Sequence, residues 1–211
     1  MTDRPISWST PAPAPDTVLP PSRPSTPLDP AEFSRWLEHQ AAPLRERWAA
    51  DIGSREAGRG DGVDELVEGF LDLFLEVLPL TLGPLRSQAE TLWVQAAQLF
   101  GSFAAQRGLA AGEVIEEFQL LRESIIRLLW ASPPVATPNR MALREVLRLN
   151  RVIDSGVTHA SVGHTDVLFF ALFQGSGVPE TLTDDARYEI LQQQHAIEAE
   201  VRSLRRVLSG R

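Results

Sequence analysis

Apolar residues recur three or four positions apart along most of the chain, which is the period of an amphipathic α-helix. The predicted helices cover about residues 30–51, 63–78, 84–107, 111–131, 139–173 and 184 onwards. Within the first of these, Pro43 predicts a break or a kink, because proline has no N–H to donate. No strand-like alternation of any length occurs, so the pattern predicts an all-α fold.

Capping and turn residues support these boundaries. Asp29 followed by Pro30 is typical of an N-cap and first helical residue, and Asn139 is placed to cap a later helix. Gly108 directly follows a predicted helix, so we expect it in the left-handed conformation. The glycines of residues 53–62 and the prolines of 132–138 predict loops.

Residues 1–28 form a segment of different composition. Eight of the 16 prolines lie there, and its few apolar residues are scattered, so we expect a disordered tail. Trp8 within it is interpreted as an exposed residue, with a short docking motif as the alternative. We expect a helical domain over residues 29–178 and a C-terminal amphipathic linker helix or coiled coil over 179–211.

The end of the helix predicted over 139–173 is apolar on all sides. Residues 167–173 read VLFFALF, without a charged side chain. A helix segment with no polar face is expected to be buried, either within its own domain or against a partner.

The last predicted helix carries a narrow apolar stripe. Residues at d and a positions of a heptad recur along it, namely Ile190, Gln194, Ile197, Val201, Leu204 and Leu208. The narrow stripe favours the seam of a dimeric coiled coil, in which Gln194 would fix the register. A terminal helix that packs on its own domain is the alternative.

Composition narrows the classes of function. With 43% hydrophobic residues the chain can bury a core, and its net charge of −8 disfavours binding to nucleic acid. The absence of cysteine excludes disulfides, thiolate metal sites and cysteine nucleophiles. No apolar run is long enough to cross a membrane, and the opening residues do not resemble a signal peptide. We therefore expect a cytoplasmic protein that does not insert into a membrane.

No motif in the sequence predicts an enzyme or a metal site. Of the four histidines, His159 and His164 lie five residues apart, about 140° out of phase on a helix, which does not suit a shared metal ion. They are interpreted as ordinary polar or partly buried residues, although a lone histidine is also a candidate axial ligand of haem. We predict a non-enzymatic protein without a cofactor.

The segment from Ala104 to Val157 resembles the N-terminal domain of the RsbT co-antagonist proteins of the RsbR type, which also precedes some bacterial histidine kinases. The matching residues are Arg107, Gly108, Val114, Phe118, Leu121, Arg122, Asn150 and Asp154, with RERW at 45–48 as an earlier element. The resemblance implies a globin-like helical fold, usually without haem, that dimerises and acts as a sensory input module. It also implies a kinase or STAS-type output, which we expect to be absent or carried by another polypeptide.

Five of these residues are interpreted as specifying the fold. Phe118 and Leu121 lie on the apolar face of their predicted helix, and Arg122 is placed to pair with Asp154 across two helices. Asn150 is included through the resemblance. The leading hypothesis for function is a sensory or regulatory module of stress-response or two-component type that acts through homodimer packing. A haem or small-ligand sensor and an adaptor that binds through Trp8 or residues 169–173 are the alternatives.

Overall fold

The computed structural model describes residues 29–53, 64–134, 143–175 and 182–209, which contain seven α-helices and no β-strand. The helices are α1 (Pro30–His39), α2 (Ala41–Gly53), α3 (Asp64–Leu82), α4 (Arg86–Gln106), α5 (Ala111–Ala131), α6 (Leu143–Gln174) and α7 (Asp184–Ser209). The prediction of an all-α fold is confirmed for these residues. The predicted tail over 1–28, with Trp8, and the predicted cap Asn139 lie outside the described residues.

The first helix begins where the local chemistry predicts, but the break before the second lies at Gln40 and not at Pro43 as predicted. Asp29 caps α1 by accepting a hydrogen bond from the backbone N–H of Ala31, and Glu32 completes a capping box. Gln40 separates α1 from α2. Pro43 therefore falls in the first turn of α2, where the missing N–H of proline leaves no hydrogen bond unmade.

Helix α3 continues past Pro79 to Leu82, so the prediction that it ends near residue 78 is wrong. The carbonyl groups of the last turn of a helix have no partner within the helix and need other donors. The hydroxyl of Ser34 in α1 donates to the carbonyl of Pro79 (2.8 Å), and the hydroxyl of Thr81 donates to that of Leu78 (2.6 Å). Both contacts stabilise the extra turn.

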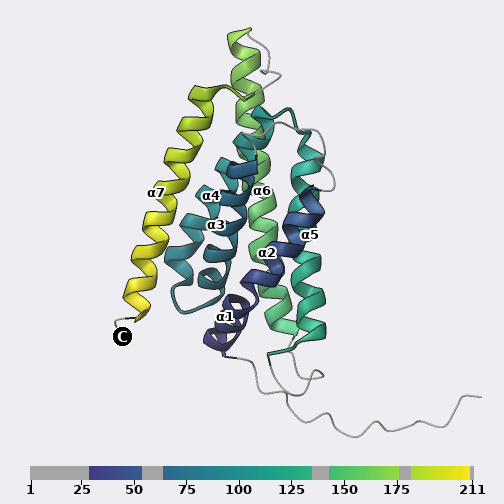
Figure 1. The fold of residues 1–211 in the computed structure, drawn as a ribbon, viewed down its shortest axis with the longest axis vertical. Coiled ribbons are helices and arrows are strands. Elements are labelled where there is room, and N and C mark those ends of the chain that lie inside the picture. Colours follow the sequence, from purple (N-terminus) through teal and green to yellow (C-terminus); the bar gives the residue numbers. More distant parts are fainter. Residues whose placement is uncertain (1–28, 54–63, 135–142, 176–181, 210–211) are drawn as a thin grey trace, which may run out of the picture.

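The long helices lie side by side, with α7 along one edge of the bundle and α5 along the other (Figure 1). Helix α6 packs along α4 more extensively than any other pair of helices, and α7 packs on α4 and α3. In the view of Figure 1 the C-terminal end of α6 projects beyond the neighbouring helices.

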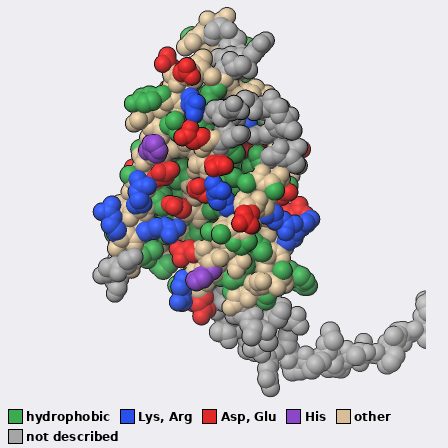
Figure 2. Space-filling view, viewed as in Figure 1, with side chains coloured by type: hydrophobic (Ala, Val, Ile, Leu, Met, Phe, Trp, Pro, Cys, Tyr) green, Lys and Arg blue, Asp and Glu red, His purple; other side chains and the backbone are tan. Residues whose placement is uncertain are grey.

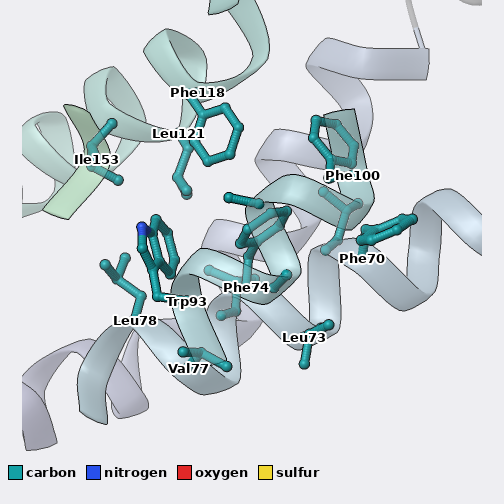
Figure 3. Close-up of a cluster of buried hydrophobic side chains, with 14 of the residues drawn as sticks. Phe70, Leu73, Phe74, Val77, Leu78, Trp93, Phe100, Phe118, Leu121 and Ile153 are labelled. Carbon is teal, nitrogen blue, oxygen red and sulfur yellow. The ribbon is translucent and has the colours of Figure 1, made fainter. Parts of the chain in front are cut away.

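Aromatic side chains fill the centre of the bundle. Phe74 of α3 lies with its ring centroid 5.2 Å from that of Trp93 and 5.3 Å from that of Phe118 (Figure 3). Phe70 and Phe100 extend the cluster, with ring centroids 5.2 Å apart. Edge-to-face pairs of this kind add to the stabilisation from apolar burial. One continuous core therefore joins α3, α4, α5 and α6.

Charged side chains of both signs are interspersed over the face shown in Figure 2. Arg45 of α2 contacts the carboxylates of Asp72 and Glu68 of α3. The hydrogen bond with Asp72 and the charge of that carboxylate raise the pKa of Arg45 above its ordinary value. Since this group stays protonated throughout the neutral range, the pair ties α2 to α3 without sensitivity to pH there.

Candidate functional site

The C-terminal end of α6 exposes a large apolar surface. We call this surface the α6 tip and define it as residues 168–173. Phe173 is 82% exposed and Leu172 is 80% exposed, and Phe169 and Phe170 are each more than 60% exposed. Large apolar side chains that are contiguous and open to solvent are typical of interaction surfaces.

The aromatic rings of the α6 tip contact one another on the surface. The ring of Phe169 is stacked on that of Phe173, with centroids 6.4 Å apart, and meets that of Phe170 edge to face. No charged residue occurs between Val167 and Gln174, so the patch has no electrostatic preference of its own. Such a surface is recognised by another apolar surface and not by an ionic ligand.

The sequence left two alternatives for this segment, burial within the domain or burial against a partner. Burial within the domain is wrong for most of it, because only Ala171 is buried among residues 168–173. Earlier in the same helix, Ile153 and Ala160 are fully buried against the core. The α6 tip therefore extends a firmly packed helix into solvent.

The heptad stripe of α7 lies against other helices of the same chain, and its predicted role as a dimer seam stays a prediction. Its residues are buried or partly buried against the core of the same chain, namely Ile190, Gln194, Ile197, Val201, Leu204 and Leu208. The stripe packs on α4 and α3. The structure thus describes the alternative in which the terminal helix packs on its own domain.

Gln194 shows how this stripe is held. Its side chain is buried, and its amide Nε2 donates to the carbonyl of Leu66 in α3 (3.3 Å). Gly69, one turn further along α3, leaves room for it, because a Cβ on Gly69 would lie 3.0 Å from the same amide nitrogen. A polar residue at an a position thus pairs with the backbone of its own domain.

The two histidines considered for haem have different surroundings. His164 is buried, and its Nε2 donates to the carbonyl of Leu109 (2.7 Å). His159 is partly buried. Neither lines the cavities of about 700, 470 and 420 Å³ at the surface, and aromatic side chains occupy the centre of the bundle.

The residues interpreted as specifying the fold meet at the contact of α5 with α6. Phe118 and Leu121 are fully buried. Arg122 forms the predicted ion pair with Asp154 of α6, with the arginine less exposed than the aspartate. The side-chain oxygen of Asn150 is buried nearby along α6. The ion pair between Arg122 and Asp154 is present, and the role of these five residues in specifying the fold stays a prediction.

A second feature is a cavity of about 700 Å³ between α4 and α6. Arg86 and Glu90 from α4 line it, together with Arg144, Arg148 and Arg151 from α6. We call it the arginine cavity. No motif marks these residues in the sequence, although the spacings of four and three between the arginines of α6 place them on one face of a helix.

The described ranges contain neither a metal-binding cluster nor a helix that could cross a membrane. No group of three or more His, Asp or Glu side chains there is arranged to hold a metal ion. None of the described helices combines the length and hydropathy that a membrane crossing requires.

Comparison of the chain with protein-family models, with curated proteins and with solved structures gives no match. The fold and the two surface features above are therefore the basis for proposing a function.

Proposed function

We propose that the protein is a non-enzymatic regulatory module of sensory type, built on a globin-like helical domain, that forms a homodimer through the α6 tip. The observation that carries the proposal is the exposure of three phenylalanines and two leucines at the end of a helix whose earlier turns pack one face on the core. The resemblance to RsbR-type sensory domains supports the same class of function.

The size of the α6 tip suits a second copy of the chain. With roughly 200 Å² per aromatic side chain, the three phenylalanines leave about 400 Å² of apolar surface accessible. The two leucines add on the order of 100 Å². Two such surfaces together approach the roughly 1,000 Å² that a specific interface needs.

The chemistry of the α6 tip also favours a second copy. A symmetric dimer brings the same patch of each chain together, so the patch must complement itself. A surface of Phe and Leu without charge meets this condition, since no like charges are opposed when it pairs with itself. Aromatic residues are also the side chains that contribute most at the centre of interfaces.

The packing of α6 favours a defined orientation of the dimer. Trp93 of α4 donates to the carbonyl of Val152 (2.9 Å), and Ser102 donates to that of Gly163 (3.2 Å). These contacts hold the helix as far as Gly163, five residues before the α6 tip. A shift of α6 in one chain would therefore move the interface, which gives the module a means to pass a signal.

Sedimentation of the full chain at micromolar concentrations tests the proposal. We expect a dimer, and we expect Phe170→Glu and Phe173→Glu each to weaken it on the order of 100-fold, because a carboxylate in an apolar interface is strongly penalised. Trp130→Glu is the matched control, since Trp130 is 84% exposed on α5 and does not belong to the α6 tip. Trp130→Glu should leave the dimer intact.

Three outcomes would overturn the proposal. A monomer at all concentrations would mean that the α6 tip is covered by a different protein or by another segment of the chain. A dimer that survives both phenylalanine substitutions would place the interface elsewhere. A dimer lost equally in Trp130→Glu would mean that the effect is not specific to the α6 tip.

A further inference from the structure

The arginine cavity carries an excess of positive charge in an acidic protein. Four arginines and one glutamate line it, while the chain as a whole has a net charge of −8. Its volume of about 700 Å³ lies within the range of roughly 300–1,000 Å³ that small-molecule sites occupy. Both the positive charge and the size of the cavity suit a small anion.

The arginines of α6 are not neutralised within the described part of the chain. Arg86 forms an ion pair with Glu90, its neighbour one turn along α4 (2.6 Å). Arg144, Arg148 and Arg151 form no ion pair with a carboxylate of the described residues, and they line the same cavity. The cavity therefore presents three unneutralised guanidinium groups to a ligand.

Three arginines elsewhere on the described surface differ in this respect. Arg45, Arg122 and Arg187 each contact a carboxylate of another helix. Like charges spaced four apart on a helix repel and destabilise it, and Arg144 and Arg148 have this spacing. This pair of like charges therefore brings no stability to α6, and a bound anion would reduce the repulsion between them.

The geometry points to a binding site for a small organic phosphate in this cavity. Guanidinium groups present several N–H donors in a planar fork that matches the oxygens of a phosphate group. Val94 and Leu147 also line the cavity, and Leu147 is 46% exposed, so an apolar part of the ligand would have a wall to contact. The ligand class is thus a phosphate ester that carries an apolar group.

This site is independent of the proposed dimer. Arg151 precedes Phe169 by 18 residues, which is roughly 27 Å along a helix. Variants in the arginine cavity therefore leave the α6 tip unaltered, and failure of one proposal does not affect the other.

Isothermal titration calorimetry of the full chain with phenyl phosphate and with inorganic phosphate tests the inference. We expect saturable binding of both, tighter for phenyl phosphate, and a loss of about tenfold or more in each of Arg148→Gln and Arg151→Gln. Leu147→Ser should weaken phenyl phosphate alone. Arg127→Gln removes an arginine of α5 that pairs with Glu123, and it should leave binding unchanged.

Absence of saturable heat with either phosphate would overturn the inference. An equal loss of affinity in Arg127→Gln would do the same, because it would reduce the effect to the overall charge of the chain. Tighter binding of citrate than of phenyl phosphate would overturn the assignment to phosphate.

Discussion

Gly101 of α4 and Ala160 of α6 lie so close that a Cβ atom on Gly101 would be 1.8 Å from the carbonyl oxygen of Ala160. The relationship is nearly reciprocal, because a Cβ on Gly163 of α6 would be 2.0 Å from the carbonyl oxygen of Gln98 in α4. Real Cβ atoms do not approach an oxygen at such distances. Neither glycine has a side chain, so α4 and α6, the pair of helices with the most extensive contact, can cross closely.

Gly101→Ala is expected to destabilise the protein by about 3 kcal/mol or more, since α4 and α6 must separate to admit the methyl group. This loss exceeds the gain of roughly 1 kcal/mol that alanine brings to a helix. Gly112→Ala is the matched control, because nothing lies within 4 Å of a Cβ there. Chemical denaturation measures both, and equal effects of the two variants would contradict the close crossing.

The ion pair between Arg122 and Asp154 is expected to contribute little to stability. The aspartate side chain is 63% exposed, and ion pairs in contact with solvent contribute about 0–1 kcal/mol. A double-mutant cycle with Arg122→Gln and Asp154→Asn should give a coupling free energy of less than about 1 kcal/mol that falls with added salt. A coupling of several kcal/mol would show that the pair determines how α5 and α6 pack.

The packing of α7 on its own chain predicts a difference between two valines of that helix. Val201 is fully buried, so Val201→Asp should destabilise the protein by about 4 kcal/mol or more. Val207 is 48% exposed, so Val207→Asp should change stability by less than about 1 kcal/mol. Thermal unfolding at several protein concentrations checks this. A loss that depends on concentration would favour α7 as the dimer seam instead.

The surroundings of His164 predict that haem does not bind. Its Nε2 is engaged by the carbonyl of Leu109, and Phe70, Phe74 and Phe100 occupy the centre of the bundle. Coordination would require breaking that hydrogen bond and displacing core side chains. We expect no Soret band after titration of the purified chain with haem. A Soret band that is lost in His164→Gln would contradict this expectation.

Most of the helical architecture could be predicted from the sequence, because local signals determine it. The range predicted for α5 is the range that the structure describes, and Gly108 has the expected positive φ of 75°. The end of α3 could not be predicted, since it depends on a hydrogen bond from Ser34 to Pro79. That contact joins residues 45 positions apart and leaves no local pattern.

The surface features were predicted less completely, for a similar reason. The heptad pattern of α7 identifies which face is buried, but a groove of the same chain and a partner helix satisfy it equally. The apolar run at 167–173 predicts burial in a core or against a partner, and only the structure shows that most of residues 168–173 are exposed. The arginine cavity requires that α4 lie beside α6, and spacing within one helix does not give this information.

The central claim is that the α6 tips of two chains lie together, and pulsed electron–electron double resonance measures this most directly. The chain has no cysteine, so Gln174→Cys would provide a single site for a nitroxide label next to the α6 tip. We predict a short and narrow distance between the labels of two chains, and a much longer one for a label at Trp130→Cys. Absence of any dipolar interaction at residue 174 would contradict the account.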